Sequence, residues 1–179
     1  MRLSIVFALI ALVILAAGAA AQDTVAKKPE ALVDRVTVVL EPGAAKNQAV
    51  AVISATNVNP ARVLSFPLKY DAGETAIKFD SITYAGSRVE HFKTKAHTLF
   101  PDRNAVLIMM LAPYVDNKCM DLTPGYGEIA RIHFSSKSDF PLTAFQIGPV
   151  KLPPENKLLY VTDTFVGVEP AFDFKAAGK

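Results

Sequence analysis

Three histidines, one cysteine and a scatter of acidic residues are the side chains of this 179-residue sequence that could serve a reaction or hold a metal. Neither an HExxH motif nor a close pair of cysteine and histidine accompanies His91, His97 or His133. A zinc site uses three or four such ligands at short, characteristic spacings. We therefore interpret the histidines as surface or strand-edge residues and predict neither a metal site nor a cofactor.

Catalytic motifs are missing in the same way. The sequence contains no G-x-S-x-G elbow and no glycine-rich phosphate loop, and no serine has an identifiable base partner. Asp80, Glu90 and Glu128 could supply the paired carboxylates of a glycosidase only if the fold brought two of them to the required separation. Solvated strand faces explain these acids more simply, and we predict that the protein is not an enzyme.

The segment from Asp116 to Asp121 is the last chemical candidate. Its two aspartates and Asn117 carry the oxygen ligands that calcium prefers, but it lacks the alternation and central glycine of an EF-hand loop. Cys119, within it, has two interpretations: an inert apolar residue in a loop or at a strand end, or an exposed thiol that cross-links two chains. Thiol reactivity requires an electropositive setting, so we favour the inert interpretation.

Short β-strands are the elements that must position these residues. From Leu64 to Tyr70 apolar and other residues alternate with a period of two, which is typical of a half-buried strand, and the turn residues Asp71 to Glu74 follow. Pro67 within this strand cannot donate a ladder hydrogen bond and predicts an edge or a bulge. Further strands are predicted at 36–40, 48–55, 77–82, 89–94, 104–111, 128–135, 142–147, 158–161 and 165–174.

These strands, separated by Gly, Pro and Asn, predict an all-β sandwich or jelly roll, with a barrel as the alternative. We place one domain at residues 33–175. Residues 104–111 are apolar at nearly every position, so this strand is predicted either to be buried on both sides or to face a partner. The connection from Pro113 to Tyr126 is predicted to be irregular.

The N-terminus has the pattern of an export signal. Arg2 precedes an unbroken apolar run from Ile5 to Ala17, and the small residues Ala19 to Ala21 suit a signal peptidase, so residues 1–21 are predicted to be removed. Residues 22–32 then form a flexible mature N-terminus, and the protein is secreted, periplasmic or extracellular. An uncleaved anchor is the alternative, although the run is short for a membrane span.

The charge pattern restricts the partners. The net charge is only +2, and the lysines and arginines are scattered rather than clustered. An electrostatic surface for nucleic acid or for an anionic membrane needs such clusters. We predict no nucleic-acid partner and no membrane contact apart from the signal segment.

The order of the strands resembles the cohesin domain family and the cohesin-like modules of exported bacterial proteins. Four stretches carry the resemblance in order: an opening strand pair, a strand ending in LKYD, a strand ending in ITYAGS, and a late strand, GYGEIARIHF, that starts just after a glycine. They lie at 36–40 with 49–53, 64–71, 77–87 and 125–134. Each motif is weak alone, and together they span most of the chain after residue 21.

The resemblance implies a nine-stranded jelly-roll sandwich that catalyses nothing and binds a dockerin-like or other exported protein through one sheet face. Carried over to this sequence, the outward positions of the matched strands include Ser65, Pro67, Lys69, Arg131 and His133, which are the predicted partner-binding residues. The same superfamily contains carbohydrate-binding modules, so a polysaccharide is the alternative ligand. For that alternative Tyr114 and Tyr126 are the candidates, because both lie in predicted loops.

Overall fold

The computed structural model describes residues 32–176, which lie in one compact unit. The predicted signal peptide, and the N-terminal segment up to residue 31, lie outside the described residues. The described part holds one short 3-10 turn, Pro101–Arg103, and the following strands: β1 Arg35–Pro42, β2 Gln48–Asn57, β3 Ala61–Asp71, β4 Ile77–Thr83, β5 Thr94–Phe100, β6 Ala105–Leu111, β7 Tyr114–Val115, β8 Lys118–Cys119, β9 Gly125–Ser136, β10 Gln146–Pro149, β11 Leu159–Thr162, β12 Gly167–Val168 and β13 Ala171–Lys175.

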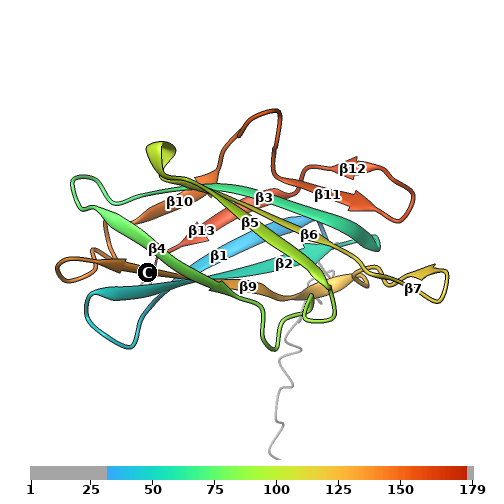
Figure 1. The fold of residues 1–179 in the computed structure, drawn as a ribbon, viewed down its shortest axis with the longest axis horizontal. Helices are drawn as coiled ribbons and strands as arrows, with labels where there is room; N and C mark the ends of the chain where they lie inside the picture. Colours follow the sequence, from blue (N-terminus) through green and yellow to red (C-terminus); the bar gives the residue numbers. More distant parts are fainter. Residues whose placement is uncertain (1–31, 177–179) are drawn as a thin grey trace, which may run out of the picture. The chain divides into compact units, whose positions relative to one another are not determined.

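Two sheets pack face to face (Figure 1). The first has the order β13-β1-β2-β9-β4, with β1 and β13 parallel and its other neighbours antiparallel. The second has the order β12-β11-β3-β6-β5, with β10 also paired to β3. The predicted all-β sandwich is confirmed. The structure describes thirteen strands rather than nine, and three of them are only two residues long.

The core lies between the inner faces of the two sheets. The alternating residues Leu64, Phe66, Leu68 and Tyr70 of β3 belong to it, as predicted, and they meet the inward residues of β1, β2, β6 and β9. Aromatic rings fill its centre, where Phe134 lies 4.9 Å from Tyr70 between ring centroids. No helix in the described part of the chain is long and apolar enough to cross a membrane.

Several predicted strand boundaries were wrong. Residues 89–93 form turns, and the strand begins at Thr94. The predicted strand at 142–147 starts only at Gln146, and the one at 165–174 is divided into β12 and β13. The connection from Pro113 to Tyr126 contains the β7–β8 hairpin, whose tip residues Asp116 and Asn117 have φ of 48° and 61°. Positive φ at both central residues suits a tight two-residue hairpin turn, which strand periodicity cannot reveal.

Pro67 lies in the middle of β3, yet the sheet provides the local edge that a proline needs. Its carbonyl accepts a hydrogen bond from the Val150 N–H at 3.0 Å, so its backbone faces the β10 and β11 side. On that side β11 pairs with β3 only as far as Ser65, and β10 begins pairing at Leu68. The missing N–H therefore falls in the interval between two short strands.

Ile129 is a second exception to simple alternation. The pattern places it on the outer face of β9 with Arg131, but it is fully buried and belongs to the core. The register of β9 against β2 shifts here, because Ile53 pairs with Ala130 whereas Ser54 pairs with Glu128. This β-bulge leaves Ile129 unpaired and turns it inward, so two successive residues of β9 reach the core.

Candidate partner-binding face

The five predicted partner-binding residues do not share one face. Ser65, Pro67 and Lys69 belong to β3 of the second sheet, whereas Arg131 and His133 belong to β9 of the first. The outer faces of two packed sheets point in opposite directions, so a single flat partner cannot cover both sets. The grouping was therefore wrong, because the alternation of each strand gives its outward residues but not the sheet that the strand joins.

The outer face of the first sheet is polar around Arg131. Its guanidinium donates two hydrogen bonds to Glu128, at 2.8 and 2.7 Å, and lies 3.6 Å from a carboxylate oxygen of Glu41. The His133 Nε2 lies 3.3 Å from the Thr83 hydroxyl. A hollow of about 700 Å³ extends from these residues to the β1–β2 turn. Its charged groups already have partners within the sheet, which fits a solvated surface.

The outer face of the second sheet is apolar. On β3 the outward residues Ser65 and Pro67 are buried, whereas Lys69 and Asp71 at the end of the strand are exposed. On β6 the outward residues are Ala105, Leu107, Met109 and Leu111, which pair across the strand with the outward residues of β3. This face, unlike the first, offers hydrophobic rather than ionic contacts.

The chain itself covers one half of this face. The loop after β10 brings Leu152 and Val150 onto Ala105 and Leu107, which form a second small hydrophobic cluster. Figure 1 shows this loop rising above the sheet between β10 and β11. Strand β6 is thus buried on both sides at its start, which was one of the two predicted alternatives.

The other half of the face has no such cover within the described chain. We define the open apolar face by its outward, partly or fully exposed residues, which come from β3, β5, β6 and β11: Val63, Ala96, Met109, Leu111, Leu159 and Val161. Burial of such a surface by a partner is favourable by about 25 cal/mol per Å² of apolar area. The sequence predicted that β6 could face a partner, because nearly all of its residues are apolar. It did not predict that residues of β5 and β11 would belong to the same face.

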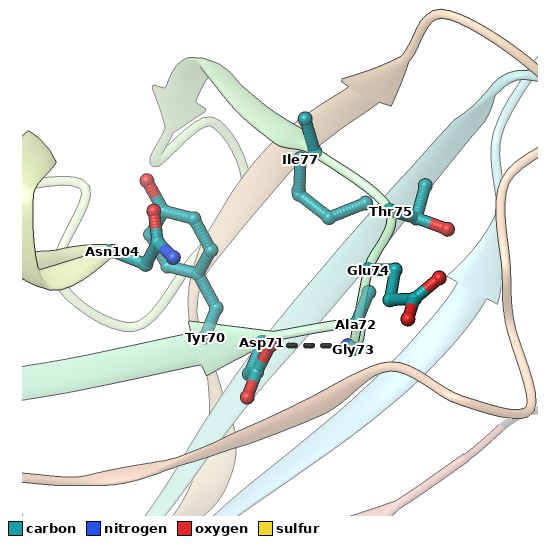
Figure 2. Close-up of a pocket in the computed structure, with 9 residues that line it drawn as sticks. Tyr70, Asp71, Ala72, Gly73, Glu74, Thr75, Ile77 and Asn104 are labelled. Carbon is teal, nitrogen blue, oxygen red and sulfur yellow. Dashed lines mark hydrogen bonds between the residues drawn. The ribbon is translucent and has the colours of Figure 1, made fainter.

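A smaller hollow lies at the β3–β4 turn. Figure 2 shows Tyr70, Asn104 and Ile77 around it, with Asp71 turned toward Gly73. The Asp71 carboxylate accepts a hydrogen bond from the Gly73 N–H at 3.1 Å, a bond that holds the turn. The hollow measures about 180 Å³ and is lined mainly by the turn residues, so we assign it to the turn rather than to a ligand.

The Asp116–Asp121 segment is arranged around an ion pair. Arg62 donates to both carboxylate oxygens of Asp121, at 3.0 and 3.1 Å, and this hydrogen bonding lowers the pKa of Asp121. Partial burial and the neighbouring Asp121 raise the pKa of the Cys119 thiol. A thiol with a raised pKa is a poorer nucleophile, which agrees with the inert interpretation. Within residues 32–176 no three His, Cys, Asp or Glu side chains gather as a metal site.

The three histidines lie on different elements. His91 precedes β5, His97 lies on β5 with its ring 5.4 Å from that of Phe79, and His133 lies on β9. Tyr114 and Tyr126 are 72% and 68% exposed, on β7 and at the start of β9. Their predicted exposure is therefore observed, although both lie in strands rather than loops.

No protein-family model matches the sequence, and no curated protein sequence matches it either. Solved structures, in contrast, match the fold. A type I cohesin from Clostridium thermocellum, in complex with a dockerin, matches with a TM-score of 0.54 and 12% identity over 79% of this chain and 98% of that chain.

The sixth cohesin of scaffoldin B from Acetivibrio cellulolyticus, also in complex with a dockerin, gives a TM-score of 0.57 at 12% identity, covering 80% of this chain and 98% of that one. The second type II cohesin module of a scaffoldin from the same organism gives 0.53 at 8% identity, covering 80% and 94%. The described residues therefore have a cohesin-like fold. The predicted resemblance is confirmed for the fold.

Proposed function

We propose that the protein is an exported, non-catalytic binding module that holds another exported protein on the open apolar face. The observation that carries this proposal is the half-covered outer face of the second sheet, where Met109 and Leu111 stay accessible while Leu107 is already buried. The two cohesins with bound dockerins described above support a protein as the partner. A dockerin-like module is the first partner to test.

A pair of single substitutions tests the face. Met109→Lys places a charge in the middle of the open apolar face. Val39→Lys places the same charge on the outer face of the first sheet, where Val39 is likewise partly buried. Affinity capture from the exported proteins of the source cell, followed by calorimetry with the purified partner, measures binding. We expect Met109→Lys to weaken binding at least tenfold, because a charge would be desolvated without a partner.

The control is informative in both directions. Val39→Lys keeps full affinity if the open apolar face is the binding surface. If Met109→Lys binds as tightly as the unmodified protein, or if Val39→Lys loses the partner instead, the assignment of the face is wrong. Circular dichroism melting of both variants shows whether each one remains folded.

Export is part of the proposal and rests on the sequence of residues 1–21. Cleavage after Ala21 would leave Gln22 as the first residue of the mature chain. Mass spectrometry of the intact protein recovered from the medium or the periplasm decides the point, because it identifies the N-terminus even where Gln22 has cyclised. A chain that still begins at Met1 would instead support the anchored alternative.

A carbohydrate ligand is the second candidate function, and it is favoured by the exposure of Tyr114 and Tyr126. Exposed aromatic rings can stack on sugar rings, although a sugar site also needs polar groups that fix its orientation. A glycan array compares the unmodified chain with the Tyr114→Ala, Tyr126→Ala double variant. Binding to no glycan by the unmodified chain would remove this candidate.

A further inference from the structure

The exposed hydrophobic side chains gather at one end of the sandwich. Of the eleven large hydrophobic residues exposed in the described part of the chain, Leu99 alone lies elsewhere. The others flank the start of β1, the β2–β3 turn, the end of β6, the β7–β8 hairpin, the start of β9 and the β11–β12 turn. We call them the apolar end: Leu32, Val33, Val58, Leu111, Tyr114, Val115, Met120, Tyr126, Phe165 and Val166.

Contacts between the connections confirm that they share this end. The Val58 N–H donates to the Asp34 carboxylate at 2.9 Å, and the Asp163 N–H donates to the Pro60 carbonyl at 3.1 Å. Arg62 lies 4.8 Å from the centre of the Phe165 ring and also holds Asp121 below the hairpin. Figure 1 shows the β7 hairpin and the β11–β12 turn at the same end of the two sheets.

Tyr126 is held outward by the partly buried side chain of Arg88. Arg88 donates hydrogen bonds to the carbonyls of Ala55, Gly125 and Thr123 and to the Asn57 side chain. Its stem lies against Gly127, where an added Cβ would be 2.8 Å from Cδ. Arg88 thus contacts Gly125 and Gly127, the residues on both sides of Tyr126, while the Tyr126 side chain is 68% exposed.

Phe165 is exposed in a turn whose backbone conformation is unfavourable for a bulky residue. Its φ is 62°, in the left-handed region that Gly and Asn occupy readily and that is unusual for a bulky residue. The side chain is 73% exposed, so no core packing compensates. Within the domain the ring contacts the Arg62 guanidinium, and the rest of the ring is left available to a partner outside the domain.

We propose that the apolar end is a contact surface for the interface of a phospholipid bilayer. The chain enters the sandwich at this end, at Leu32, and the apolar run Ile5 to Ala17 lies upstream of it. The segment between Ala17 and Leu32 can span at most about 50 Å. A bilayer that holds the run during export is therefore within reach of this end. After cleavage at Ala21 the apolar end would be the one remaining membrane signal, and a single signal gives reversible rather than stable attachment.

The composition of the surface suits lipid better than a sugar or a polyanion. Tyrosine favours the headgroup level of bilayers, and Phe165, Val115, Met120 and Val166 add apolar area beside Tyr114 and Tyr126. Charges of both signs are interspersed, with Asp116 and Lys118 on the hairpin and Arg62 paired to Asp121. The scattered charges argued against an anionic membrane, but they do not exclude an apolar contact with a zwitterionic one.

The absence of tryptophan from the sequence allows a direct test. Because the sandwich has its own core within a compact unit, the chain from Gln22 to Lys179 is the protein to use. Phosphatidylcholine vesicles are added to the Tyr126→Trp variant and, as the matched control, to the Leu99→Trp variant. We expect a blue-shifted emission and quenching by brominated phosphatidylcholine for the first variant and neither for the second.

Flotation with the same vesicles measures the strength of binding. The triple variant Tyr114→Ser, Tyr126→Ser, Phe165→Asn should bind at least tenfold more weakly, and Leu99→Ser should match the unmodified chain. The single variant Phe165→Asn should keep its melting temperature while it lowers vesicle binding, because asparagine tolerates the left-handed conformation and this gain offsets the lost contact between the ring and Arg62. This combination separates a contact residue from a residue that only supports the fold.

Several results would overturn the proposal. It is wrong if the unmodified chain does not float with phosphatidylcholine, or if the Tyr126→Trp emission does not respond to vesicles. It is also wrong if binding requires anionic lipid and disappears in 1 M NaCl, or if the same residues instead mediate a dimer in analytical ultracentrifugation. The Met109→Lys variant tests the open apolar face separately and should float unchanged, so failure of either proposal leaves the other testable.

Discussion

At the scale of single residues, Arg88 and Gly127 decide how β9 begins. The guanidinium is surrounded by neutral acceptors, and burial lowers its pKa. Asn57, which accepts one of these bonds, is 1% exposed. This one side chain therefore satisfies acceptors from two segments at once: Ala55 and Asn57 near the end of β2, and Thr123 and Gly125 around the start of β9. The sequence motif GYGEIARIHF contains Gly127, but nothing in it indicates that an arginine from another turn lies against that glycine.

Gly127→Ala should lower the free energy of unfolding by about 1–3 kcal/mol, the usual cost of overpacking. The new Cβ would meet Arg88 Cδ at 2.8 Å, and the pinned guanidinium restricts how far the stem can move. Urea denaturation measures the change. Gly148→Ala is the matched control, since an added Cβ there meets nothing within 4 Å. Equal stability of the two variants would contradict the close packing of Arg88 against Gly127.

The Arg62–Asp121 pair should make stability depend on pH. Hydrogen bonding to Arg62 lowers the pKa of Asp121 in the folded state below its unfolded value of about 3.9. This stabilisation is fully present above the unfolded pKa and is lost as the pH falls through the lower folded pKa. Asp121→Asn should therefore lose less free energy of unfolding between pH 5 and pH 2 than the unmodified protein.

Urea titrations at successive pH values follow the Asp121 effect. Asp102→Asn, in the exposed turn after β5, controls for the loss of one carboxylate. If the free energy of unfolding falls with pH equally in the unmodified protein and in Asp121→Asn, the ion pair does not contribute to the pH dependence of stability.

At the scale of elements, strand periodicity predicted most of the strands because alternation depends only on local sequence. The residues of β3 illustrate this, with Phe66 and Leu68 inward as expected. The bulge at Ile129 and the interval beside Pro67 depend on neighbouring strands instead. No local pattern could reveal them, because both arise where two registers meet.

Pro67→Ala should destabilise β3 by about 1–2 kcal/mol, through a more flexible unfolded chain and a new N–H without a partner strand. The interval between β10 and β11 offers no ladder acceptor at this position. The midpoint of urea unfolding gives the change. A variant that is as stable as the original would mean that the new N–H finds water or a carbonyl.

At the scale of the whole domain, the first and last strands lie side by side. Strand β1 pairs in parallel with β13, and the Ala171 N–H donates to the Asp34 carbonyl at 3.0 Å. Arg35 forms an ion pair with Asp173, and its carbonyl accepts a hydrogen bond from the Tyr160 hydroxyl. The boundary of the fold is therefore set near Asp34, close to the predicted start of the domain.

Truncation tests this boundary. A chain that begins at Leu32 should melt within about 2 °C of one that begins at Gln22, because it keeps these contacts. A chain that begins at Val36 should melt about 5–10 °C lower, since it loses the bonds of Asp34 and Arg35. Differential scanning calorimetry gives both values. A large effect of the first truncation would show that residues before Leu32 contribute to stability.

The sequence by itself determined that this chain is an all-β sandwich, because strand alternation and turn residues are local properties. It also indicated the exposure of Tyr114 and Tyr126 and the special character of β6. Only the tertiary structure decided that Lys69 and Arg131 lie on opposite sheets and that half of the second sheet's outer face is covered by its own loop. It also decided that exposed apolar residues from six separate parts of the chain meet at one end of the sandwich. These results depend on how distant strands are ordered within and between the sheets, and the alternation of a single strand carries no information about that order.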